Sequence, residues 1–143
     1  MAELLGQHRY QLDAKGRIAL PARYRDALGE GAYVTLGQER CLTVFPTGEW
    51  QRRSDEVRAL PPMSRGARNY SRVFFGSAER ADLDKQGRLV IPQRLREAIG
   101  LDRDAVVLGQ FDHLEVWSGP DWDRYESENL GPYLDGSLDP TAG

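Results

Sequence analysis

Polar and apolar positions alternate along the first part of the chain, as they do in half-buried strands. His8, Tyr10 and Leu12 alternate with Arg9 and Gln11, and Ile18 and Leu20 follow after a turn. This pattern predicts two short strands that pair as a hairpin. Pro21 and Gly29 then predict a two-turn helix, because proline favours the first helical position and glycine the position just past the end.

Two apolar segments, 33–36 and 41–45, follow this helix and are separated by a polar loop. They predict two further strands, which makes the unit β-β-α-β-β, with a core at about residues 6–46. Four short strands around one helix bury too little apolar surface to be stable alone. We therefore expect the unit to share a core with a second one.

The second unit is visible as an internal repeat. The segment Leu12–Gly29 realigns without a gap on Leu83–Gly100, and nine of the eighteen positions are identical, where unrelated segments would share about one. After a one-residue insertion the match continues to Trp50 and Trp122. We predict a mainly β, α+β protein with a first repeat and linker helices at 1–76 and a second repeat with a C-terminal helix at 77–130.

Helix signals outside the repeats complete the organisation. Residues 46–60 predict a helix with Trp50 inward, ended by Pro61 and Pro62, and Ser64 predicts the start of another through Phe75. The run 118–120 predicts the start of a C-terminal helix. The Gly, Pro, Ser and Asp content of residues 131–143 predicts a disordered acidic tail.

Composition excludes several classes of protein. No apolar run approaches the roughly 20 residues of a membrane span, and the first residues do not resemble a signal peptide, so we expect a cytoplasmic protein. With Cys41 as the single cysteine and two histidines, neither an internal disulfide nor a structural zinc site is expected. No cofactor and no small-molecule substrate are expected either.

The net charge is −3, but the charged residues are distributed unevenly along the chain. Residues 101–143 carry −8, whereas residues 1–100 carry +5. Seventeen of the nineteen cations are arginine, which suits planar recognition of phosphate or guanine. A GC-rich genome would favour arginine equally well. The basic first part of the chain is nevertheless where a nucleic acid would bind.

Both repeats carry an Asp-x-x-Gly-Arg turn, at 13–17 and 84–88. Aspartate at the start of a turn accepts backbone N–H bonds, and glycine provides the positive φ that tight turns need. These properties give Asp13, Gly16, Asp84 and Gly87 a turn-organising role. Turn chemistry does not require Arg17 or Arg88.

Two explanations of these arginines remain compatible. Each arginine can pair with the aspartate of its own turn and stiffen it, or it can reach phosphate or guanine from the tip of a two-stranded ribbon in the DNA major groove. The turns also hold Lys15 and Lys85, and the short helices hold Arg23 and Arg25, mirrored by Arg94 and Arg96. Residues two apart on a helix point roughly 200° apart, so one of each pair at most faces a given surface. The candidate DNA contacts are Arg17, Lys15, Arg25, Arg23, Arg88 and Lys85.

Other motifs have plainer interpretations. Arg65, Arg68 and Arg72 form one helical stripe, for which a solvated or subunit-facing role is favoured over a phosphate track. Asp112 and His113 predict a surface loop, because no nucleophile is recognisable near them. We expect no catalytic residue, no metal ligand and no enzyme activity.

These motifs, taken in order, resemble the MraZ family, whose two halves belong to the SpoVT/AbrB class. The resemblance runs from about Leu5 to Tyr125. It rests on the two Asp-x-x-Gly-Arg turns, each followed by an apolar-Pro step and an Arg-x-Arg helix. It also rests on Cys41-Leu42-Thr43-Val44-Phe45-Pro46 leading to Trp50, and on Gly109-Gln110 leading to Leu114-Glu115-Val116-Trp117.

The resemblance implies swapped-hairpin barrels formed within one chain and ring-shaped homo-oligomers. It further implies sequence-specific binding to direct repeats in the family's own promoter, usually as a repressor of the division and cell wall gene cluster, in the cytoplasm and at the nucleoid. Our hypothesis gives Arg17 the main base or phosphate contact, with Lys15 and Arg25 supporting and Asp13 orienting it. Arg88 has the same role or is a structural copy, and the more basic first repeat is favoured for docking.

Two other function classes stay open. One is an AbrB-type, antitoxin-like interaction and dimerisation module, for which the tail offers few apolar anchors: Tyr133, Leu134 and Leu138. The other is a small barrel enzyme, for which the sequence nominates no residue. A shift assay with the upstream intergenic DNA would separate a DNA-binding protein from an enzyme.

Overall fold

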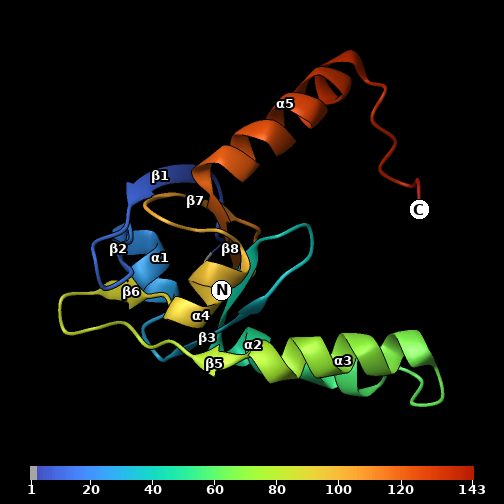
Figure 1. The fold of residues 1–143 in the computed structure, drawn as a ribbon, viewed down its shortest axis with the longest axis horizontal. Helices are drawn as coiled ribbons and strands as arrows, with labels where there is room; N and C mark the ends of the chain where they lie inside the picture. The colour runs from blue at the N-terminus through green and yellow to red at the C-terminus, as the bar shows by residue number, and fades with distance from the viewer. Residues whose placement is uncertain (1–2) are drawn as a thin grey trace.

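The computed structural model describes residues 3–143. Figure 1 shows a body of strands and short helices from which longer helices extend. The elements are β1 (Gln7–Gln11), β2 (Arg17–Ala19), α1 (Ala22–Ala27), β3 (Ala32–Leu36), β4 (Leu42–Pro46), α2 (Thr47–Arg58), α3 (Arg65–Ser77), β5 (Glu79–Arg80), β6 (Arg88–Val90), α4 (Gln93–Ala98), β7 (Asp104–Gly109), β8 (Leu114–Ser118) and α5 (Gly119–Asp135). The predicted mixed fold of mostly antiparallel sheet with several helices is confirmed.

Strands of the two repeats are exchanged in the sheets. The larger sheet has the order β1-β7-β8-β4-β3-β5, so β1 of the first repeat pairs with β7 of the second. Conversely, β5, the counterpart of β1, pairs with β3 of the first repeat. The smaller sheet is a two-stranded ribbon of β2 and β6, again one strand from each repeat. Closure of these strands into a barrel stays a prediction.

The hairpin predicted between residues 8–12 and 18–20 is therefore wrong. The two strands exist, but β1 pairs with β7 and β2 pairs with β6, so they lie in different sheets. Alternation of polar and apolar residues determines which face of a strand is buried. It carries no information about which strand completes the backbone hydrogen bonds, and here both partners come from the other repeat.

Equivalent side chains of the two repeats meet in one hydrophobic core, as the repeat predicts. Ile18 and Leu89 face each other across the ribbon and are fully buried. Further equivalent pairs in the same core are Leu20 with Ile91, Tyr24 with Leu95, and Leu28 with Ile99. Burial of these apolar surfaces is the main stabilising contribution to the fold. Since each repeat contributes half of every pair, neither repeat has a complete core of its own.

The helices begin where the sequence predicts them. Pro46 immediately precedes α2, which ends at Arg58 before the two prolines. The hydroxyl of Ser64 accepts a hydrogen bond from the backbone N–H of Ala67, at 3.2 Å, and starts α3. Trp50 of α2 stacks on Phe74 of α3 with ring centroids 5.3 Å apart, so the expectation that Trp50 points inward is confirmed.

The C-terminal helix is longer than expected. α5 continues to Asp135 and is followed by Gly136, which adopts the left-handed conformation with φ at 75°. Residues 131–135, predicted as part of a disordered tail, are thus helical. Composition placed the helix end at Gly131 and Pro132, but a glycine in the left-handed conformation is the usual stop signal, and Gly136 is the glycine that adopts it. No helix between residues 3 and 143 is long and apolar enough to cross a lipid bilayer.

Candidate nucleic-acid interface

The turn at residues 13–17 is organised by the carboxylate of Asp13. One carboxylate oxygen accepts the backbone N–H groups of Lys15 and Arg17 at 2.9 and 3.0 Å. The other oxygen accepts the Nε–H of the Arg17 guanidinium. Gly16 has φ at 75°, which an L side chain rarely adopts. The turn thus fixes the Arg17 side chain at its Nε.

The turn at residues 84–88 repeats this geometry. Asp84 accepts the backbone N–H groups of Gln86 and Arg88, both at 2.9 Å, and its second oxygen accepts the Arg88 Nε–H, also at 2.9 Å. Gly87 has φ at 76°. The predicted turn-organising role of the two aspartates and two glycines has a direct structural basis in both repeats.

The backbone N–H bonds keep both aspartates ionised. The pKa of Asp13 lies below its ordinary value, chiefly because the backbone N–H of Arg17 donates to the carboxylate, although partial desolvation opposes this shift. The pKa of Asp84 is lowered in the same way by the backbone N–H of Arg88. Each carboxylate is an anion at neutral pH, and its lowered pKa keeps it paired with its arginine to a lower pH than an ordinary aspartate.

The ribbon brings the two turns to one surface. Within the ribbon Arg17 lies opposite Val90, and Arg88 lies opposite Ala19. Alternate residues of a strand point to opposite faces, so the inward direction of Ile18 and Leu89 places Arg17 and Arg88 together on the outer face. A guanidinium nitrogen of Arg88 lies 4.0 Å from the carboxylate of Asp13. The Arg17 and Arg88 side chains are 28% and 27% exposed, so both remain partly accessible to solvent.

A second pair of arginines braces the turns across the repeats. The Nε of Arg96 donates to the carbonyl oxygen of Ile91 at 3.0 Å and lies directly over Gly16. A Cβ at position 16 would come within 2.6 Å of that Nε. Arg25 lies over Gly87 in the same way, with its Cδ 2.8 Å from the position of a Cβ. Each turn is therefore covered by an arginine from the short helix of the opposite repeat.

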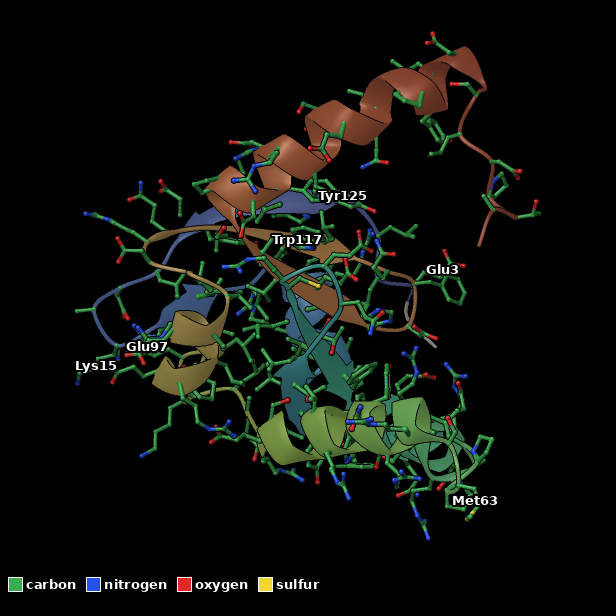
Figure 2. All side chains as sticks on the ribbon, turned by 45° about the vertical axis from the view of Figure 1, so that its right-hand side comes forward. Glu3, Lys15, Met63, Glu97, Trp117 and Tyr125 are labelled. Atoms are coloured by element: carbon green, nitrogen blue, oxygen red, sulfur yellow. The ribbon has the colours of Figure 1, made fainter. Side chains whose placement is uncertain are left out.

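The remaining predicted contacts differ in their surroundings. Lys15 and Lys85 are exposed at the turns, and Figure 2 shows Lys15 at the left-hand edge of the molecule. Arg23 is exposed, and it forms no ion pair within residues 3–143. Its counterpart Arg94 instead pairs with Glu79 at 2.7 Å and donates to the backbone carbonyl of Ser77.

The structure brings five of the six candidate contacts to the two turns, with Arg23 on the neighbouring helix. Sequence reasoning missed Arg96, which lies over a turn just as Arg25 does. The repeat itself was the signal that could have found it, because Arg96 aligns with Arg25. The two turns together with Arg25 and Arg96 carry six cations and two carboxylates. This surface suits an anionic ligand.

The other cluster of polar side chains lies away from this surface. His113 contacts the carboxylate of Asp112 at 2.7 Å, and the second oxygen of Asp112 pairs with Arg52 at 2.8 Å. These contacts tie the loop between β7 and β8 to α2. Among residues 3–143 the structure contains no group of three or more His, Cys, Asp and Glu side chains placed to hold a metal ion.

Comparison with known proteins identifies relatives over nearly the whole chain. The family model described as "MraZ protein, putative antitoxin-like" matches twice, at residues 4–73 and 74–131. A protein of Salinispora tropica named transcriptional regulator MraZ is 50% identical over 131 residues, which cover 92% of each chain. A protein of the same name from Thermobifida fusca is 51% identical over 124 residues, which cover 87% of each chain. These relatives are named as regulators and not as enzymes.

Proposed function

Because the chain belongs to the MraZ family, we propose that it is a transcriptional regulator that binds DNA through the outer face of the β2–β6 ribbon. The observation that carries this proposal is the pairing of Arg17 and Arg88 on one exposed face, each held at Nε by its own aspartate. A two-stranded ribbon fits the major groove, and a guanidinium makes bidentate contacts with guanine or phosphate.

The proposal assigns the interface to both repeats. The basic charge of the first repeat alone favoured that repeat for docking, but the ribbon is built from one strand of each. Arg17 and Lys15 approach the DNA from the first turn, and Arg88 and Lys85 approach it from the second. Arg25 and Arg96 lie over the turns, where Arg25 supports the contact with DNA, and Arg23 is available for a flanking phosphate.

The proposal also covers the DNA sequence that is bound and the oligomer that binds it. We infer that the protein represses its own promoter in the division and cell wall gene cluster, by binding direct repeats as a ring-shaped homo-oligomer in the cytoplasm, at the nucleoid. One protomer presents few cations, and its C-terminal part is acidic. Several protomers on successive repeats make the later contacts intramolecular, so that avidity compensates for a weak single contact.

The direct test is the affinity of Arg17→Ala for the upstream promoter repeats. A lost bidentate contact is worth about 1–3 kcal/mol, which corresponds to roughly fivefold to 150-fold weaker binding. The slope of log affinity against log salt concentration should also become less steep by about one if the contact is to phosphate. Electrophoretic shift and fluorescence anisotropy over a salt series measure both quantities.

Arg40→Ala is the matched control, because Arg40 is an exposed arginine remote from the ribbon, with a distant partner in Asp121 at 3.7 Å. It should bind the promoter as the unaltered protein does. Unchanged affinity of Arg17→Ala at every salt concentration would remove Arg17 from the interface. The same measurement on Arg88→Ala decides whether the second repeat makes an equal contact.

The alternative function is an antitoxin-like protein-interaction and dimerisation module. The observation that favours it is the exposure of Leu130, Tyr133 and Leu134 on α5, which exceeds what the sequence alone indicated. Such a module would bind a partner protein through this end of the helix. A purified protein that shifts no promoter DNA at low salt, where electrostatic binding is strongest, would favour this alternative.

A further inference from the structure

The last turns of α5 extend from the body and leave an apolar face uncovered (Figure 1). Near its start, α5 is held by Trp122 and Tyr125, which pack against Trp117 of β8. Farther along, Leu130, Tyr133 and Leu134 follow the spacing of one helical face, and the last two are 70% and 72% exposed. A short helix without packing is only marginally stable in water. An apolar patch on such a helix indicates an interaction site.

The helices α2 and α3 present a second unpartnered surface, which we call the arginine face. Arg58 of α2 and Arg68 and Arg72 of α3 surround a hollow of about 210 Å³. Its apolar lining is formed by Val57, Leu60, Pro61, Pro62 and Ala67. This hollow is large enough to receive a leucine or tyrosine side chain, and its rim is positively charged.

The arginines of this face lack acidic partners. Within residues 3–143, Arg68 and Arg72 form no ion pair, and α3 contains no acidic residue. Arg58 has only a distant partner in Asp55, at 3.8 Å. Arg68 donates to the backbone carbonyl oxygens of Pro62 and Met63, which fixes its direction. A cationic rim around an apolar hollow fits an acidic, apolar ligand.

The end of α5 has this composition. The segment Thr47–Ser77, which spans α2 and α3, carries a net charge of +3, whereas Gly119–Asp135 carries −4. After Arg124 the chain contains four acidic residues and no further base. The exposed apolar side chains lie among these acids. The charge and the apolar content of the two surfaces are therefore complementary.

We propose that the end of α5 in one copy of the chain docks on the arginine face of a second copy. This inference deepens the self-association that forms part of the proposed function and rests on it. Leu134 and Tyr133 fill the hollow beside Leu60, and the acids of α5 lie near Arg58, Arg68 and Arg72. The occupant is a second copy because the chain itself carries the complementary charge, +3 on Thr47–Ser77 and −4 on Gly119–Asp135. The contact is not made within one chain, since α5 and α3 diverge (Figure 1) and no hydrogen bond or ion pair joins them in residues 3–143.

The proposed contact determines the symmetry of the assembly. The two surfaces are different, so the association is head-to-tail, and such contacts form a ring when the rotation between copies closes. Both surfaces lie on the side of the molecule away from Lys15 and the turns (Figure 2). The β2–β6 ribbon therefore stays accessible to DNA in every copy.

Two variants, each defective in one surface, test the contact. The first is Tyr133→Glu with Leu134→Glu, and the second is Arg68→Glu with Arg72→Glu. Size-exclusion chromatography with light scattering should show an oligomer for the unaltered chain and a monomer for each variant. When the two variants are mixed, each supplies the surface that the other lacks, so the mixture should form a dimer and nothing larger.

A control variant carries the same change of charge as the second variant but lies outside α2, α3 and α5: Arg40→Glu with Arg103→Glu, two exposed side chains. It should keep the size of the unaltered oligomer. Circular dichroism confirms that every variant is folded. The proposal is overturned if the unaltered chain is a monomer at tens of micromolar, if either variant keeps the full size, or if the mixture of folded variants stays monomeric.

DNA binding is measured separately, so that failure of the interface and failure of the proposed function can be distinguished. A short duplex with one promoter repeat at low salt does not require an oligomer, and both monomeric variants should bind it. Loss of this binding by the unaltered chain, with its assembly intact, would exclude the DNA function and leave the interface. Normal binding together with an unchanged oligomer in both variants would exclude the interface alone.

Discussion

At the scale of single residues, each Asp-x-x-Gly-Arg turn uses one carboxylate to bind both the backbone and an arginine side chain. Asp13 uses one oxygen for the backbone and the other for the Arg17 side chain. The ion pair that stiffens the turn is therefore the same contact that aims the guanidinium. Two features of the structure require glycine at this position of the motif: the φ angle is positive, and an arginine of the other repeat lies over the backbone.

Gly16→Ala should destabilise the fold. An L side chain at positive φ costs about 1–2 kcal/mol, and its Cβ would approach the Nε of Arg96 and the carbonyl oxygen of Ile91, at 2.6 and 2.9 Å. Urea denaturation followed by circular dichroism should give a free energy of unfolding lower by about 2 kcal/mol. Promoter affinity should also fall, because the turn that carries Arg17 is displaced.

Gly48→Ala is the matched control for this substitution. Gly48 lies in α2 with open space around the position of its Cβ. Alanine is favoured over glycine inside a helix by about 1 kcal/mol, so this variant should be as stable as the unaltered chain or more stable. If both variants unfold at the same urea concentration, the turn does not need its glycine.

At the scale of elements, the helices α2, α3 and α5 are defined by signals at their ends. Ser64 caps α3, Ser118 caps α5 by accepting from the backbone N–H of Asp121, and Gly136 ends α5. Between these ends, aromatic contacts hold helices on the sheet: Trp50 of α2 on Tyr33 of β3, and Trp122 of α5 on Trp117 of β8. Local capping sets where each helix begins, and side-chain packing sets where it lies.

Ser64→Ala should therefore weaken α3 without changing the fold. The substitution removes the side-chain acceptor of the Ala67 N–H, and loss of a serine N-cap costs about 1 kcal/mol. The free energy of unfolding from urea denaturation should decrease by that amount. Ser127→Ala, an exposed position inside α5, should change it by less than about 0.5 kcal/mol. Equal effects of the two substitutions would show that the cap contributes nothing.

At the scale of the whole molecule, the exchange of strands makes the two repeats interdependent. β1 needs β7, β3 pairs with β5, and the ribbon needs one strand from each repeat. The candidate interface has the same property, because both of its arginine turns are placed by that ribbon. A function assigned to one repeat alone would be missing half of its cations.

The fragment 1–78 should accordingly not fold as a monomer. Without β7 and β6, the strands β1 and β2 lose their backbone partners and the core loses half of its side chains. We expect either an unfolded fragment or a dimer in which a second copy takes the place of the missing repeat. Light scattering and circular dichroism on the fragment distinguish these states. A folded monomer at micromolar concentration would contradict the interdependence.

The sequence by itself determined the elements, the duplication and the residue types at the candidate interface. Local spacing is sufficient for these, since a proline before a helix, a serine cap or an Asp-x-x-Gly-Arg turn depends on neighbours within five residues. The turn roles of Asp13 and Gly16 and the core positions Ile18 and Leu89 follow from the same local rules.

Only the tertiary structure decided which strands pair and which side chains meet across the repeats. The predicted hairpin was wrong because the backbone hydrogen bonds of a strand are satisfied equally well by a distant strand, and β1 and β2 both pair with strands of the other repeat. The same exchange placed Arg88 beside Arg17, and Arg96 over Gly16. Contacts between residues some 70–80 positions apart depend on how the repeats interlock, which spacing along the chain does not encode.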